Sequence, residues 1–181
     1  MFGRRSHQAL WLSKLGNMLW AEEGTTAIEF AFVALPLIAV IVAIFETCSL
    51  FVAQEVLQTA TNKAARLIQT GQAQLTSMTA AQFKQALCNQ ASVLFPCSGI
   101  YVNVQKFGSF AGVSWPSPIK NGAIDASKIT YSIGGPGDII LVQAFYDWPV
   151  ILGPLGLSLS NMKDGGHLVV AAAAFLNEPY Q

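Results

Sequence analysis

The chain has 181 residues, of which 52% are hydrophobic and only 11% are charged. Soluble domains carry about 25% charged residues, so this composition favours a membrane-attached protein. Ten basic and ten acidic residues cancel, which argues against nucleic-acid binding because a nucleic-acid-binding protein needs a basic face. The high apolar fraction also excludes an acidic disordered chain. The length accommodates one membrane segment and one domain of about 100–150 residues.

The first long apolar segment approaches the width of a membrane. Residues 31–45 carry no charge, Phe30 extends the run, and Glu29 and Glu46 bracket it. A helix over these residues is about 24 Å long, against a hydrocarbon core of about 30 Å. Uncharged residues continue to position 54 beyond Glu46, so we expect a transmembrane helix over residues 25–54. The alternative is a buried helix of a soluble protein, which we disfavour because the rest of the chain is too small to surround it.

The flanking charges predict the orientation of this helix. Arg4, Arg5 and Lys14 precede the span, whereas the first basic residue after it is Lys63. The positive-inside rule then places the amino terminus in the cytoplasm and the carboxyl-terminal part outside a bacterial inner membrane.

Two other interpretations of the span fit the sequence less well. A cleaved secretory signal needs a pair of small residues after its apolar core, and the sequence after Phe45 is ETCSLF. A lipoprotein site at Cys48 has poor neighbours in Glu46 and Thr47.

The helical pattern continues beyond the span. Apolar residues recur at steps of three and four, which predicts an amphipathic extension over residues 55–70 that offers a stripe to a folded domain. Gly71 is the expected stop. The stripe consists of Leu50, Ala53, Leu57, Ala60, Ala64 and Ile68, and the other face is expected to carry Gln54, Glu55, Gln58, Asn62 and Lys63.

A second helix and a pair of cysteines open the remaining domain, residues 71–181. Thr79 and Gln82 have the spacing of a capping box, which predicts a helix to about Ala91. Cys88 and Cys97 would lie in an oxidising compartment, where a disulfide is expected. A metal pair is the disfavoured alternative because no second pair of ligands accompanies them.

Three segments predict a small antiparallel sheet. Residues 100–107 alternate, residues 139–146 form an apolar run, and residues 168–176 form another whose alanines also suit a helix. Residues 111–133 are rich in turn signals, and residues 148–161 predict an apolar loop or short hairpin. The expected fold class is α+β, with a long amino-terminal transmembrane-to-amphipathic helix packed on this sheet.

One short motif before the span is more specific. Gly24 is followed by four small or apolar residues and then by Glu29 and Phe30. Here the chain resembles class IV prepilins, and most closely the TadE-like proteins of tight-adherence (Flp) pilus systems. The resemblance implies a pilin-like fold, cleavage between Gly24 and Thr25 by a prepilin peptidase, and removal of a cytoplasmic leader, residues 1–24. It also assigns Glu29 and Phe30 to subunit assembly.

Elementary electrostatics supports a role for Glu29 independently. A carboxylate at the edge of the hydrocarbon costs roughly 2–3 kcal/mol unless it is paired or reaches the interface. Cleavage after Gly24 would create an α-amine on Thr25, which is mostly cationic at neutral pH. The new amine of a neighbouring subunit is therefore a natural partner for Glu29. The alternative is an interfacial glutamate that only marks the end of the span.

The resemblance extends to the carboxyl-terminal part of the chain. A strand led by Gly-Asp at residues 137–142, Tyr146 with Trp148-Pro149, and the Asn-Glu-Pro ending within residues 174–180 all look like TadE-family patterns. Residues 71–135 carry no motif that we can assign.

The sequence does not support catalysis, a cofactor or a metal site. Gly134–Gly137 lacks the Lys-Ser/Thr of a phosphate-binding loop, and we expect a turn there, with Asp138 as a turn carboxylate. Outside the expected leader, His167 is the only histidine, and we interpret it as a turn residue.

The resemblance therefore implies a minor pilin or pseudopilin, a structural subunit for adhesion or secretion and not an enzyme. Its implied partners are the prepilin peptidase, the major Flp pilin, companion minor pilins, the inner-membrane assembly platform and the lipid bilayer. A pseudopilin of a secretion machine is a related alternative. The main alternative is an uncleaved single-pass anchor that carries a periplasmic interaction or ligand-binding domain.

Overall fold

A computed structural model describes residues 25–115, 117–151 and 159–180. The chain forms two units, Met1–Ile44 and Phe45–Gln181. The expected leader, which ends at Gly24, lies outside the described residues, as do residues 152–158 of the expected loop 148–161.

Helix α2, Thr25–Gln69, is the longest element and runs through both units. Its most apolar 18 residues have a mean hydropathy of 2.7, and none of them is buried. This helix is long and apolar enough to cross a bilayer. The predicted long apolar helix is confirmed.

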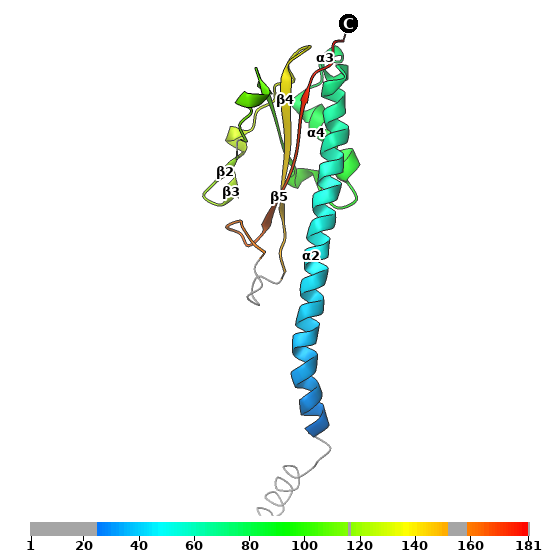
Figure 1. The fold of residues 1–181 in the computed structure, drawn as a ribbon, viewed down its shortest axis with the longest axis vertical. Helices are drawn as coiled ribbons and strands as arrows, with labels where there is room; N and C mark the ends of the chain where they lie inside the picture. Colours follow the sequence, from blue (N-terminus) through cyan, green and yellow to red (C-terminus); the bar gives the residue numbers. More distant parts are fainter. Residues whose placement is uncertain (1–24, 116, 152–158, 181) are drawn as a thin grey trace, which may run out of the picture. The chain divides into compact units, whose positions relative to one another are not determined.

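The second unit is an α+β fold, as expected (Figure 1). Two helices follow α2, namely α3, Gln72–Leu75, and α4, Ala80–Ala91. The main sheet has the strand order β1-β4-β5, with both neighbours antiparallel. The strands are β1, Tyr101–Phe107; β4, Ile139–Trp148; and β5, His167–Leu176.

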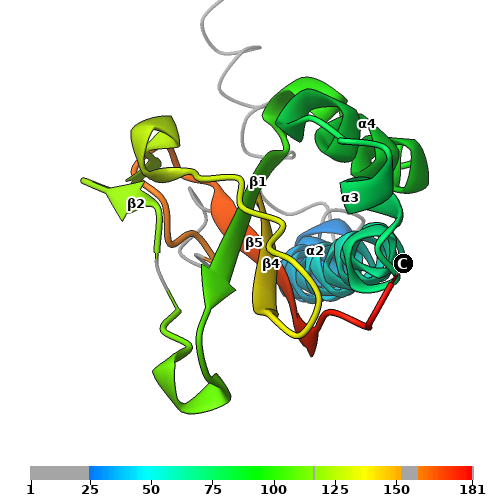
Figure 2. The same cartoon turned by 90° about the horizontal axis from the view of Figure 1, so that it is seen from above.

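The predicted loop-rich segment before β4 contains only short elements. A two-stranded ribbon is formed by β2, Ile119–Lys120, and β3, Ala123–Ile124. The short 3-10 helices are η2, Cys97–Gly99; η3, Phe110–Gly112; and η4, Ala126–Lys128. Figure 2 shows α2, α3 and α4 on one side of the main sheet and β2 on the other.

The core of the second unit lies between this helical layer and the sheet. The predicted stripe on α2 is confirmed, because Ala53, Leu57, Ala60, Ala64 and Ile68 are all buried and Leu50, its first member, is partly buried against them. Phe83 and Leu87 of α4 complete the helical side. The strands contribute alternate residues to the same cluster, as the period of a strand requires; they are Val104, Ile140, Val142, Ala144, Val169 and Ala171.

Local chemistry sets the ends of the helices. The capping box at Thr79 and Gln82 is present as predicted. Gly71 follows α2 with φ +80°, a left-handed conformation that favours glycine. A Cβ at this position would lie 2.3 Å from the ring of Tyr180. The expected stop is therefore confirmed, and the carboxyl-terminal tail packs directly on it.

Two sequence expectations in this unit are wrong. Gln54 and Gln58 were assigned to the face of α2 turned away from the domain, yet both are half-buried and bond to β5. His167 was expected in a turn but begins β5, opposite Trp148. In each case a long-range pairing partner decided the position.

Candidate assembly site

The residues expected to direct assembly lie at the start of α2. Thr25, Glu29 and Phe30 are all helical and exposed, and Phe30 keeps 74% of its surface accessible. Thr25 and Glu29 are four residues apart, so they share one face of the helix. Gly24, the other residue of the expected cleavage site, lies outside the described residues.

The helix that follows Glu29 presents an uncovered apolar surface. Large apolar side chains are exposed all around it, from Ile28 to Val52. A helix that is apolar on every side is stable in lipid or against other helices, not in water. The exposed set is Ile28, Phe30, Phe32, Val33, Leu35, Leu37, Ile38, Val40, Ile41, Val42, Ile44, Phe45, Phe51 and Val52.

The structure brings the two carboxyl-terminal sequence patterns together. Asn177, which is fully buried, donates from Nδ2 to the carbonyls of Ile133 and Gly135, each at 3.0 Å. Its backbone N–H donates to the carbonyl of Asp138, and its carbonyl accepts from Gly137 N–H. The Asn-Glu-Pro ending therefore holds the turn that leads into β4.

Asp138 is a turn carboxylate, as expected from the sequence. Its Oδ2 accepts from the backbone N–H of Gly135 at 2.7 Å and from Lys106 Nζ at 2.9 Å. These two interactions, the backbone hydrogen bond first, lower the pKa of Asp138 below its usual range. A Cβ at Gly134 would meet the Asp138 side chain at 2.9 Å. The turn is thus a packed structural feature.

The tail beyond Asn177 closes the end of α2. Glu178 N–H donates to the carbonyl of Gln69 at 2.9 Å, which satisfies one of the unpaired carbonyls of the last helical turn. The ring of Tyr180 covers Gly71. The end of α2, the turn before β4 and the tail therefore form one connected support, which we call the carboxyl-terminal clamp: Gly71, Gly137, Asp138, Asn177, Glu178 and Tyr180.

Two glutamines of α2 cover the outer edge of β5, and sequence reasoning missed them. Gln58 donates to the carbonyl of Ala172 at 2.9 Å and accepts from the N–H of the same residue at 3.2 Å. Gln54 donates to the carbonyl of Val170 at 2.6 Å. The side chains replace a neighbouring strand and protect an edge that would otherwise invite pairing. Their spacing of four residues was the available signal.

The cysteines have separate roles in the structure. Cys88 of α4 and Cys97 form a disulfide with a Cα–Cα distance of 5.4 Å. The bridge fixes the end of α4 beside the strand that follows. Cys48 is a free, exposed cysteine on α2.

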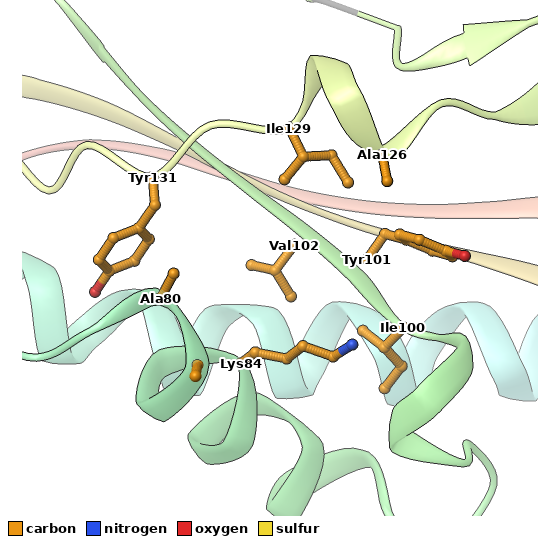
Figure 3. A pocket seen from close by; sticks show the side chains of 9 residues that line it. Ala80, Lys84, Ile100, Tyr101, Val102, Ala126, Ile129 and Tyr131 are labelled. Atoms are coloured by element: carbon orange, nitrogen blue, oxygen red, sulfur yellow. The ribbon is translucent and has the colours of Figure 1, made fainter.

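A hollow lies between α4, β1 and η4 (Figure 3). It has a volume of about 280 Å³. Lys84 extends along it toward Ile100 (Figure 3) and places Nζ 6.0 Å from the centroid of the Tyr101 ring. Tyr131 donates its hydroxyl to the carbonyl of Met78 at 3.1 Å, and burial raises the pKa of Tyr131. The lining holds no nucleophile paired with a base.

Within residues 25–115, 117–151 and 159–180, no three His, Cys, Asp or Glu side chains lie close enough to hold a metal ion. Asp147 and Asp164 line a second hollow of about 230 Å³. Burial, and then the charge of Asp164, raise the pKa of Asp147.

These features define a class of protein in which one exposed apolar helix continues into a small, disulfide-bonded α+β domain. Residues 24–66 match the family model described as TadE-like protein. The match confirms the resemblance of this segment to the TadE-like family, and it ends before α3. No curated protein and no solved structure matches the chain.

The family match supports a pilus-associated, minor-pilin-like role and a structural rather than a catalytic function. Together with the apolar helix, it also supports attachment to a membrane.

Proposed function

We propose that the chain is a minor pilin or pseudopilin of a Flp-type pilus. It is made as a precursor with a cytoplasmic amino terminus, and a prepilin peptidase cleaves it between Gly24 and Thr25. The mature helix packs among the helices of the major pilin and of companion minor pilins, at the inner-membrane assembly platform. The domain beyond α2 lies outside the inner membrane.

The observation that carries this proposal is the match over residues 24–66, which begins at Gly24 and includes Glu29. The exposure of Glu29 and Phe30 is what a contact with a neighbouring subunit requires. Cleavage would create a cationic amine on Thr25, four residues before Glu29. The amine of one subunit would then pair with the Glu29 carboxylate of a neighbouring subunit. A charge pair at the edge of the hydrocarbon is strengthened by the low dielectric, so it would set the axial position of each subunit.

The proposal is tested by the substitution Glu29→Gln, which removes the charge and keeps the size. The matched control is Glu55→Gln, an exposed carboxylate farther along the same helix. We expect Glu29→Gln to leave cleavage intact and to lower the yield of assembled pili by about tenfold or more, since charge-assisted interactions contribute about 1.5–3 kcal/mol. Glu55→Gln should leave the yield unchanged.

The two main interpretations give different results. Wild-type pilus yield in Glu29→Gln would contradict an assembly role for this carboxylate. Gly24→Leu should leave the chain as a precursor if a prepilin peptidase processes it. An uncleaved anchor of a periplasmic interaction domain would be indifferent to both substitutions.

A further inference from the structure

The connection between β4 and β5 has an unusual composition. Residues 148–162 carry no charge and lie between Asp147 and Lys163. Ile151 keeps 80% of its surface exposed, and Leu159, at the other end, keeps 36%. Single exposed aliphatic side chains are ordinary on a protein surface, so the position of these two residues in the molecule decides what they contact.

A hydrogen bond fixes the position of Ile151, near the start of this connection, along the axis of α2. The backbone N–H of Ile151 donates to Glu46 Oε1 at 2.5 Å. Glu46 is the first charged residue after Glu29, so it marks the end of the charge-free stretch of the helix. Phe45 and Phe51, on either side of Glu46, are 71% and 68% exposed. The part of α2 from Thr25 to Glu46 already measures about 33 Å, which matches a hydrocarbon core of about 30 Å. Ile151 therefore lies where the outer interface between lipid and water is expected, within the last part of the predicted span.

The hydrogen bonds between α2 and residues 170–178 indicate the same position along the helix axis independently. Gln54 contacts Val170, Gln58 contacts Ala172, and Gln69 contacts Glu178. Residues later in α2 therefore contact residues later in the segment 170–178, so the two segments run in the same direction. The beginning of β5, and Leu159 before it, must then lie toward the Phe45 end of the part of α2 that belongs to this unit.

The far end of the connection is also anchored. The Leu159 carbonyl contacts His167 Nδ1, and Asn161 Oδ1 accepts from the N–H of Leu168 at 2.7 Å. These bonds hold Leu159 against the start of β5. The backbone of Ile151 and the backbone of Leu159 are therefore each held by a hydrogen bond.

We propose that Ile151 and Leu159 form a second membrane contact, which lies in the outer interface of the bilayer that α2 crosses. Burial of an Ile or Leu side chain contributes about 1.5–3 kcal/mol when complete. The segment offers no basic residue, and Asp147 and Asp164 adjoin it. Apolar burial drives the contact, so it does not need anionic lipid. It fixes the domain against the membrane surface before assembly.

The test uses the full chain with Cys48→Ser, because Cys88 and Cys97 are already joined. An environment-sensitive fluorophore is attached through Ile151→Cys, and separately through Leu159→Cys. The matched control is Val93→Cys, an 87% exposed aliphatic position in the same unit. Val40→Cys, within the apolar helix, reports whether α2 is in the bilayer. Each protein is placed in phosphatidylcholine vesicles that contain nitroxide-labelled lipid, with or without phosphatidylglycerol.

We expect a blue-shifted emission at residue 151 and about threefold more quenching there than at residue 93, with a smaller effect at residue 159. Phosphatidylglycerol should not change the result. Water-like emission at residue 151 while residue 40 is quenched would overturn the inference and leave membrane anchoring intact. A blue shift without lipid quenching, growing with protein density, would assign the contact to another protein copy and also overturn it. A requirement for phosphatidylglycerol would contradict apolar burial as the driving force.

Discussion

At the scale of single residues, the turn before β4 depends on one buried amide. Asn177 donates to the backbone carbonyls of Ile133 and Gly135, each of which also accepts one further hydrogen bond, from Gln74 Nε2 and from the N–H of Asp138 respectively. A hydrogen bond of this kind contributes about 0.5–1.5 kcal/mol. This explains why an asparagine near the end of the chain matters to a turn forty residues earlier.

The first prediction concerns this amide. Asn177→Ala should lower the free energy of unfolding by about 1–2 kcal/mol, since two carbonyls each lose one of their two donors. Asn89→Ala, an exposed asparagine on α4, is the control and should change it by less than about 0.5 kcal/mol. Chemical denaturation of the detergent-solubilised chain measures both. Equal effects of the two substitutions would remove Asn177 from the clamp.

The second prediction concerns pH and Asp147. Burial, and then Asp164, raise the pKa of this carboxyl, so the folded state favours its protonated form. The stability that this carboxyl contributes in its protonated form is present in full below the ordinary pKa of an aspartate. That stability is lost as the pH rises through the raised pKa of Asp147. Asp147→Asn should therefore stabilise the protein at pH 7 by less than about 1 kcal/mol, given partial solvent screening.

Thermal unfolding from pH 3 to pH 8 tests the sign of this effect. The gain in Tm from Asp147→Asn should be about 2 °C at neutral pH and should vanish at the acidic end. Asp164→Asn should give a smaller gain of the same sign, because it removes only the neighbouring charge. A gain that grows as the pH falls would show that the pKa of Asp147 is lowered instead.

At the scale of elements, α2 stabilises the sheet in two ways. Its apolar stripe packs on the face of the sheet, and its glutamines bond to the edge of β5. The opposite edge of the main sheet, strand β1, is covered in part by residues 130–132. The carbonyl of Thr130 accepts from the N–H of Val104, and the N–H of Ser132 donates to the carbonyl of Val104. The carbonyl of Val170 and both backbone groups of Ala172 on β5, and both backbone groups of Val104 on β1, are therefore hydrogen-bonded.

The third prediction concerns the glutamine edge. Gln58→Ala should cost about 1–2 kcal/mol and speed the hydrogen exchange of the Ala172 amide, because both bonds to that residue are lost. Gln85→Ala is a close control: Gln85 of α4 also donates to an asparagine four residues on, but it reaches no strand. Unchanged exchange at Ala172 would show that the edge is protected by something else.

Periodicity and local caps predicted most of these elements from the sequence. The three-and-four spacing from Ala53 to Ile68 marked the buried stripe, and the T-x-x-Q spacing at Thr79 marked the start of α4. The same periodicity could not tell that Gln54 and Gln58 meet a strand more than a hundred residues away. Asn103 and Gln143, buried and bonded to each other at 3.1 Å, were missed for the same reason. A polar side chain is predicted as exposed until its long-range partner is known.

At the scale of the whole molecule, one helix serves two environments. Its first part is apolar and uncovered, while its second part supplies much of the core of the folded unit. The domain cannot be separated from the helix without losing that core. A pilin-type subunit needs this arrangement, because the helix that enters an assembly must carry its domain with it.

Cleavage after Gly24 is the step by which we propose that this chain enters a pilus pathway. The most direct test is the intact mass and amino-terminal sequence of the membrane-extracted protein, from cells with and without the prepilin peptidase. We expect a chain of residues 25–181 that begins at Thr25 only when the peptidase is present, and a precursor that begins at Met1 when it is absent. A chain that begins at Met1 in both strains would rule out cleavage by this peptidase and favour the uncleaved anchor.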